Sequence, residues 1–193
     1  MIIKQISKKE IKNADLFQQA ILNPNKCKRF RPWSVVYKNF LRNPSLFIGA
    51  YDKNKIIGIV FGYIKKNKVL LGEMAISNDY QRKGIGRKLI FEFEKNVKKL
   101  NKKYIELGAF GSAQNFYLNL GYTPILFVQI YKNKVKKNYN KLNYNVLKET
   151  NYIDAKRLFI KIDKLDDKLK QKAEKDFNAY NVIYLFRKNF DFG

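Results

Sequence analysis

Two glycines set among cations form the stretch of this sequence with the clearest potential for chemistry. Gly84 and Gly86 follow the apolar run LLGEMAI and stand where a helix-patterned segment begins. The first N–H groups of a helix have no intrahelical acceptor and the helix dipole is positive there, so this end attracts anions. Glycine adopts positive φ and lets the backbone approach phosphate oxygens that a Cβ would hold away. Because Arg82, Lys83 and Arg87 add positive charge, we expect a phosphate or diphosphate ligand.

Features missing from the sequence narrow the kind of phosphate site. A dinucleotide-binding fingerprint has a third glycine three residues after the second, where this chain has Leu89. A Walker loop has four residues between its glycines and then Lys followed by Ser or Thr, and the sequence has neither feature. The alternative interpretation is that Gly84 and Gly86 only form a tight turn, because an isolated glycine pair is a weak motif.

The composition excludes several kinds of active site. The 193 residues include no histidine, which excludes Ser-His-Asp and Cys-His catalysis and most transition-metal sites. The single cysteine, Cys27, excludes an intrachain disulfide and is typical of a reducing compartment. We therefore expect no metal, and we interpret Cys27 as an incidental small residue and not as a nucleophile.

The charge of the chain is strongly positive. The formal net charge is +24, from 40 Lys and Arg against 16 Asp and Glu. Such a charge is typical of nucleic-acid-binding proteins, but here nearly all the cations are Lys, scattered among abundant Asn, Ile and Tyr, as compositional drift would produce. We do not expect nucleic acid as the physiological partner. The apolar runs are too short for a signal peptide or a membrane span, so we expect a cytoplasmic protein without a membrane partner.

Periodicity predicts the elements that must position the glycine pair. Alternation and turn residues predict strands over 1–7, 45–52, 55–64 and 68–76, joined in part as a meander of hairpins. Helical spacing of apolar residues predicts helices over 11–23, 33–41 and 85–100. A strand over 102–110, a short helix over 112–120 and a strand over 124–132 follow.

The Lys- and Asn-rich segment 132–143 is the best candidate for a domain boundary. Beyond it, strands are predicted over 142–149, 155–162 and 181–189, with a helix between the last two. The aspartates near the start of that helix lie where the dipole favours negative charge. The sequence therefore predicts a core over 1–133 and a ββαβ extension over 134–193.

Residues 81–86 also resemble a family motif. Gln-Arg-Lys-Gly-Ile-Gly matches in full the Arg/Gln-x-x-Gly-x-Gly/Ala pattern of the GNAT superfamily (GCN-related N-acetyltransferases), which are acyl-CoA-dependent. NFYLNLGY, residues 115–122, resembles the Phe-Tyr-x-x-x-Gly-Phe/Tyr element of that family, and the order of elements over 1–131 is similar. The resemblance implies an α+β fold of GNAT type. In it, a mixed, mostly antiparallel central sheet is flanked by helices, and the ββαβ segment is a C-terminal extension.

The resemblance implies acetyl-CoA as the co-substrate, with no metal. Its diphosphate would bind the backbone N–H groups of 82–87, and its pantetheine arm would pair with the end of the preceding strand. A backbone N–H near Met74 or Ile76 would then polarise the thioester carbonyl. The residues that the resemblance assigns to acetyl-CoA are Met74, Ala75, Ile76, Gln81, Arg82, Lys83, Gly84, Ile85, Gly86, Arg87 and Asn115.

Acetyl transfer to an amine needs a neutral amine and a protonated or stabilised leaving thiolate. Tyr117 stands where many family members carry the tyrosine that donates to the thiolate, although a core role is the alternative in a chain with 13 tyrosines. Glu73 is the only carboxylate in the strand before the glycines. We interpret it as the base, acting directly or through water, and pairing with a lysine of a neighbouring strand is the alternative. A strand bulge would reverse the direction of this side chain, which the sequence leaves open.

The acceptor is the least determined part of the prediction. The resemblance places it between the first helical pair and the strand near Ile125 to Ile130, where Phe30 and Trp33 would line its pocket. Nearby cations would disfavour polycationic acceptors, and the alternative is that these cations only solvate a surface loop. We expect transfer to a primary amine of a small molecule or peptide in a ternary complex. A non-catalytic acyl-CoA-binding or sensing module, and a nucleic-acid or ribosome-associated protein, are the alternatives. The extension would complete the main sheet, cover the acceptor pocket, or form a homodimer contact.

Overall fold

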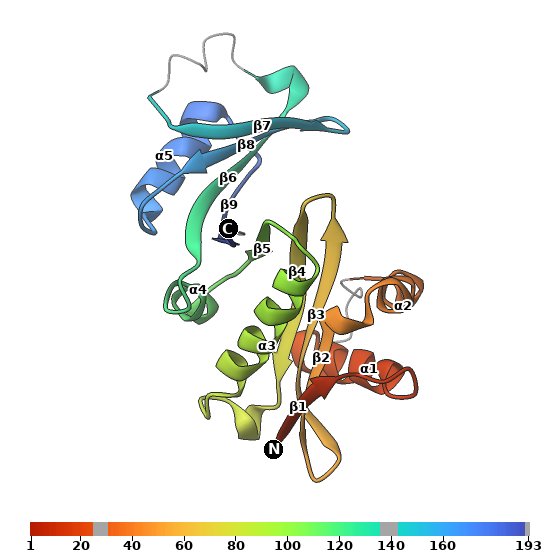
Figure 1. The fold of residues 1–193 in the computed structure, drawn as a ribbon. Coiled ribbons are helices and arrows are strands. Elements are labelled where there is room, and N and C mark those ends of the chain that lie inside the picture. The colour runs from red at the N-terminus through yellow and green to blue at the C-terminus, as the bar shows by residue number, and fades with distance from the viewer. Residues whose placement is uncertain (25–30, 136–142, 192–193) are drawn as a thin grey trace. The chain divides into compact units, whose positions relative to one another are not determined.

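The computed structural model describes residues 1–24, 31–135 and 143–191. It divides into two compact units, Met1–Ile105 with Asn189–Gly193, and Glu106–Lys188 (Figure 1). The fold is α+β and six strand pairs within the units are antiparallel, in agreement with the mostly antiparallel sheet that the sequence predicts. Compact units do not show which residues carry the catalytic function. The division into a catalytic core over 1–133 and an extension over 134–193 therefore stays a prediction.

The first unit contains the glycine segment. Its elements are β1 (Ile2–Gln5), α1 (Ile11–Leu22), α2 (Trp33–Arg42), a 3₁₀ turn (Pro44–Leu46), β2 (Phe47–Asp52), β3 (Lys55–Lys65), β4 (Lys68–Ile76), a 3₁₀ turn (Asn78–Tyr80) and α3 (Ile85–Lys99). The strands β1 to β4 lie side by side in sequence order, each antiparallel to the next. The predicted meander is confirmed. Between β2 and β3, Lys53 and Asn54 both have positive φ, of 46° and 66°, as a two-residue type I′ turn requires.

One face of this sheet packs against α3. Gly58 and Gly62 of β3 lie beneath that helix, where a Cβ would stand 3.2 Å from the Leu89 side chain and 2.5 Å from the Phe93 ring, respectively. Both leucine and phenylalanine side chains are fully buried. The absence of side chains at Gly58 and Gly62 therefore allows α3 to pack closely on β3.

The other face of the sheet packs against α1 and α2. Phe61 and Tyr63, which alternate with Gly62, contact the ring of Phe47 at centroid distances of 4.9 and 5.9 Å. Phe47 in turn meets Phe40 of α2 at 5.5 Å. The two faces of β3 thus pack against different helices, because successive side chains of a strand point to opposite faces of the sheet.

A β-bulge interrupts β4 where the chemistry is expected. Phe61 pairs with Glu73 and Gly62 pairs with Leu71, so Gly72 is an extra residue of β4. Without the bulge, Glu73 would share a face with Leu71 opposite Gly62, toward α3. With it, Glu73 shares the face of Phe61, toward α1 and α2. A Cβ on Gly72 would meet the Tyr63 ring at 2.3 Å, so the bulge position accepts only glycine without rearrangement.

The second unit contains the predicted C-terminal segment. Its elements are the end of β5 (Tyr104–Gly108), which begins in the first unit, α4 (Ser112–Leu118), β6 (Thr123–Tyr131), a 3₁₀ turn (Lys132–Lys134), β7 (Val146–Tyr152), β8 (Ala155–Lys161), α5 (Asp167–Phe177) and most of β9 (Asn181–Asn189). Strands β9, β6, β8 and β7 lie side by side in that order. The ββαβ order is confirmed, and Asp166 caps α5 by accepting a 2.9 Å hydrogen bond from the Leu169 N–H.

The first strand of the extension is displaced from its predicted position. The prediction of a strand over 142–149 was wrong by several residues, because β7 continues to Tyr152, which pairs with Ala155 across the turn. That turn contains Ile153 at a φ of 49°, a conformation uncommon for a β-branched residue. In the part of the chain that the structure describes, no helix has the length and apolar character needed to cross a bilayer.

Candidate functional site

The N-terminus of α3 is the geometric centre of the predicted phosphate site. Gly84 is the N-cap residue, with a left-handed backbone at φ 76° and ψ 0°, and no side chain within the described residues caps the helix. Nothing lies within 4 Å of a Cβ built on Gly84, so this position is open to solvent or to a ligand. Arg82 also has positive φ, of 60°. The left-handed residues Arg82 and Gly84 therefore lead into a helix N-terminus without a side-chain cap, which is the kind of backbone that can bind an anion.

Exposed polar side chains surround this turn. Gln81, Arg82, Lys83 and Arg87 are exposed, whereas Ile85 and Gly86 are buried. The Gln81 amide donates to the Ile76 carbonyl at 3.2 Å and to Asn78 Oδ1 at 3.0 Å, which ties the loop to the end of β4. The structure thus brings together the predicted phosphate-binding residues of this loop, with three exposed cations beside the helix end.

The end of β4 leads directly into this loop. Met74, Ala75 and Ile76 pair with Val60, Ile59 and Gly58 of β3. Ala75 is buried, and the other two are half-buried. The three residues predicted to pair with the pantetheine arm are therefore held in regular strand geometry immediately before the glycine loop.

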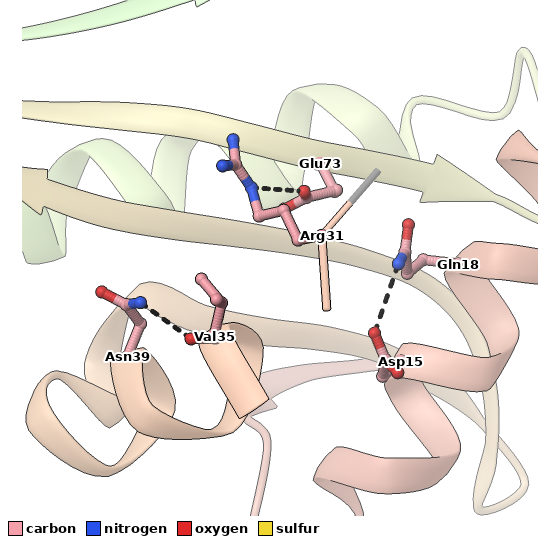
Figure 2. A network of polar contacts seen from close by, with 6 residues as sticks. All are labelled: Asp15, Gln18, Arg31, Val35, Asn39 and Glu73. Carbon is pink, nitrogen blue, oxygen red and sulfur yellow. Dashed lines mark hydrogen bonds and ion pairs between the residues drawn. The ribbon is translucent and has the colours of Figure 1, made fainter. Parts of the chain in front are cut away.

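Glu73 lies on the face of the sheet that α1 and α2 cover. Its side chain is 3% exposed, and Oε1 accepts a 2.8 Å hydrogen bond from Arg31 Nε, as Figure 2 shows. The cation that pairs with Glu73 is thus Arg31, just before α2, and not a lysine of a neighbouring strand. Burial raises the pKa of Glu73, Asp15 raises it further, and Tyr63 and Arg31 oppose the shift. The carboxyl is accordingly a better proton acceptor than a solvated glutamate.

Three further residues of the first unit belong with Glu73, and the sequence reasoning missed them. Asp15 and Gln18 are 1% exposed on α1, where the Gln18 amide donates to Asp15 Oδ1 at 3.3 Å (Figure 2). The ring of Tyr63 lies 4.3 Å from the Arg31 guanidinium carbon. A signal for the α1 pair existed, because Asp15 and Gln18 occupy apolar-face positions four and seven residues after the buried Ile11.

The predicted acceptor-pocket aromatics are only partly described. Trp33 begins α2, is half-buried and stacks on Tyr37 at a centroid distance of 5.2 Å. Phe30 and Cys27 lie outside the described residues. Trp33 thus lies at the N-terminal end of α2, two residues after Arg31, which pairs with Glu73.

Tyr117 and Asn115 belong to α4 in the second unit. Tyr117 is 6% exposed, and its ring contacts those of Tyr122 at 5.4 Å and Phe186 at 6.3 Å. Burial raises the pKa of Tyr117, so the phenol is protonated at neutral pH. Asn115 is exposed on the same helix. Over the described residues, no three or more of His, Cys, Asp and Glu are grouped so that they would hold a metal ion.

Comparisons with known proteins agree with this geometry. A family model described as an acetyltransferase (GNAT) domain matches residues 15–141, more than half of the chain. No curated protein matches the sequence.

Solved structures of the same type share the fold. An acetyltransferase of the GNAT family from Staphylococcus aureus Mu50 is 21% identical, with 84% of this chain and 99% of that chain covered at a TM-score of 0.56. The ribosomal-protein-S18-alanine N-acetyltransferase from Escherichia coli is 16% identical, with 86% and 95% covered at 0.51. A GNAT family acetyltransferase from Brucella melitensis, in complex with acetyl-CoA, is 16% identical, with 63% and 81% covered at 0.51.

Proposed function

Because the chain belongs to the GNAT acetyltransferase family, we propose that it transfers the acetyl group of acetyl-CoA to a primary amine by direct attack in a ternary complex. The acceptor is a small molecule or a peptide. One observation carries the proposal: a strand that bears a buried carboxylate runs directly into an open, cation-rimmed helix N-terminus. An acetyl-CoA-dependent transferase needs both parts within reach of each other.

The diphosphate of acetyl-CoA binds the N–H groups at the start of α3, with Arg82, Lys83 and Arg87 around it. The Brucella melitensis protein was solved with acetyl-CoA, which supports this choice of co-substrate. The arm of the co-substrate lies along Met74 to Ile76, and Gln81 holds the loop against that strand end. The family resemblance also assigns Asn115, on α4, to the co-substrate. All of these contacts are made by backbone groups or by polar side chains of this chain, without a metal.

The chemistry requires three proton movements. Glu73 takes one proton from the acceptor ammonium, and the neutral amine nitrogen attacks the thioester carbonyl carbon. The new carbon–nitrogen bond forms, the carbon–sulfur bond breaks, and the electron pair leaves on sulfur. Tyr117 stabilises that thiolate by donating its O–H. Because burial raises the pKa of Tyr117, a phenolate left there is costly, and its proton is regained from the nitrogen of the tetrahedral adduct, which carries two N–H protons and keeps one in the amide product.

An acceptor screen tests the proposed function. The protein with acetyl-CoA and a panel of small amines and peptides with free N-termini is followed by release of the CoA thiol. We expect amine-dependent release that yields one acetylated amine per thiol. The Escherichia coli relative, named for acetylation of a ribosomal-protein alanine, makes peptide N-termini part of the panel. Tight acetyl-CoA binding without release for any amine would instead favour a non-catalytic acyl-CoA-binding module.

The pH dependence of the reaction identifies the base. Glu73 must be ionised to accept a proton, so kcat/KM rises as pH rises through its pKa and is lost below it. Since burial raises that pKa, the acid limb of the profile lies above the ordinary glutamate value of about 4.3. Asp15, Arg31 and Tyr63 are the charged and titratable groups that act on it. In Glu73→Gln we expect this limb to disappear, whereas Glu94→Gln, a change at another buried glutamate, retains it. An identical limb in Glu73→Gln would assign the base to another group.

A further inference from the structure

The strands β9, β6, β8 and β7 of the second unit form a sheet with two unlike faces. One face packs on α5, since the Tyr184 hydroxyl of β9 accepts a 3.1 Å hydrogen bond from the Asp166 N–H at the start of that helix. The opposite face is centred on Phe159, Phe127 and Ile183, which pair with one another across β8, β6 and β9. We call it the open face, because Phe159 and Ile183 are only half-buried although they are apolar.

Exposed aromatic rings stand at one end of the open face. Tyr131 and Tyr152 both pair with the buried Ala155, so they lie on either side of it with their Cα atoms about 10 Å apart. The Tyr131 ring stacks on Tyr180 at a centroid distance of 4.2 Å, and the Arg157 guanidinium carbon lies 3.8 Å from the centre of the Tyr152 ring. Tyr131 and Tyr152 are nevertheless 44% and 54% exposed. Each ring thus has one flat partner and remains accessible to a further flat ring.

The charge of the open face has a single sign. On the described strands β6 to β9, every charged residue that the pairing places on this face is a cation, namely Lys148, Arg157, Lys161 and Arg187. Glu149 of β7 lies on the opposite face, where it pairs with Lys156 at 2.9 Å. Arg187 is neutralised by Glu106 of β5 at 2.9 Å, and the other three cations have no acidic neighbour on this face of the four strands. The open face therefore complements a polyanion.

Cations set among exposed aromatic rings favour a polymer that carries both phosphates and flat bases. Single-stranded nucleic acid binds proteins in this way, with its backbone along positive charge and its bases stacked on aromatic side chains. A duplex keeps its bases stacked inside, so it cannot use the rings equally. The net charge of the whole chain does not indicate nucleic acid, because its lysines are scattered. The arrangement on the open face is what indicates it.

We propose that the open face binds single-stranded nucleic acid, with bases stacked on Tyr131 and Tyr152 and phosphates held by Lys148, Arg157 and Lys161. Three of its four strands lie after residue 141, where the match to the acetyltransferase family ends. Binding at this face goes beyond acetyl transfer and needs no acetyl-CoA, so it stands or fails independently of the proposed function.

Three labelled oligomers of about twelve units, a usual length for such a site, test the wild-type protein by fluorescence anisotropy. They are oligo(U), oligo(dU) and a tetrahydrofuran phosphodiester that has the same phosphates but no bases. The salt is held at about 150 mM, because affinity for a polyanion depends on salt. We expect the baseless oligomer to bind roughly tenfold or more weaker than oligo(U), since each stacked base contributes several-fold. Tighter binding of oligo(U) than of oligo(dU) identifies RNA as the ligand, and equal binding supports both.

Two outcomes of this experiment overturn the inference. Equal affinity for the baseless oligomer means that charge alone attracts the strand. An oligoglutamate of the same charge that displaces oligo(U) equally well points to an acidic protein partner instead.

Substitution of the two tyrosines locates the binding. Tyr131→Leu and Tyr152→Leu keep the charge and an apolar side chain but remove the ring, so each is expected to weaken oligo(U) binding roughly five- to hundredfold. Their affinity for the baseless oligomer should be unchanged, and Tyr131→Phe and Tyr152→Phe should bind oligo(U) like wild type. Phe91→Leu is the matched control, because Phe91 is an aromatic residue of α3 with a similar exposure of 52%. Wild-type affinity for oligo(U) in both leucine variants, or an equal loss in Phe91→Leu, contradicts the proposed site.

Discussion

Tyr117→Phe is expected to lower kcat by about 10² to 10⁴, the usual contribution of a general acid. The substitution removes the hydroxyl and keeps the ring, whose contacts with Tyr122 and Phe186 hold α4 in the second unit. We therefore expect little change in melting temperature and little change in acetyl-CoA affinity. Steady-state kinetics with the acceptor from the screen, calorimetric titration and thermal unfolding measure the three quantities.

Tyr122→Phe is the matched control for this prediction. Tyr122 is a second buried tyrosine in the same cluster of rings, five residues along the chain, and it is not placed at the leaving thiolate. Its substitution should leave kcat close to the wild-type value. If Tyr117→Phe turns over within about threefold of wild type, the hydroxyl is not the acid, since that effect is far below the usual contribution.

Gly86→Val is expected to abolish detectable acetyl-CoA binding in a calorimetric titration. Gly86 lies in the first turn of α3 and is buried, so circular dichroism and thermal unfolding first establish that the variant is folded. The added isopropyl group stands at the N–H groups that bind the diphosphate and holds it away. Gly84→Val should lose binding too. Because Gly84 has a φ of 76°, backbone strain in this variant should also lower the free energy of unfolding by about 1–2 kcal/mol.

Gly121→Val separates the loss of a ligand site from backbone strain. Gly121 has a φ of 79° and nothing within 4 Å of an added Cβ, so it matches Gly84 in conformation and in open space. It lies after α4 and not at the start of α3. We expect Gly121→Val to be less stable yet to bind acetyl-CoA. A folded Gly86→Val with wild-type affinity would remove the glycine loop from the proposed site.

Local patterns predicted most of the fold. The strand over 68–76 and the helix that begins at Ile85 have the predicted starts, because periodicity and turn residues act over a few positions. Gly84 was identified for the same reason, since a left-handed residue before a helix favours glycine. The shift of β7 arose at Ile153, whose left-handed backbone no local preference indicates.

The surroundings of Glu73 required the tertiary structure. A carboxylate in a strand is visible in the sequence, but the partner of Glu73, Arg31, is 42 residues away. The face of the sheet on which Glu73 lies depends on the bulge residue Gly72. Asp15 and Gln18 break the apolar stripe of α1, which indicates a buried polar group without indicating what it meets. Tyr63 reads as a core aromatic, and only its contact with Arg31 connects it to chemistry.

The extra residue in β4 means that the face taken by the proposed base depends on one position that pairs with nothing on β3. If Gly72 joined the ladder opposite Phe61, Glu73 would fall opposite Val60 and would leave Arg31 for the side of α3. Deleting Gly72 would instead keep Glu73 opposite Phe61, whereas a side chain at this position would meet the Tyr63 ring. We therefore infer that this point of β4 tolerates the loss of Gly72 better than its exchange for a larger residue.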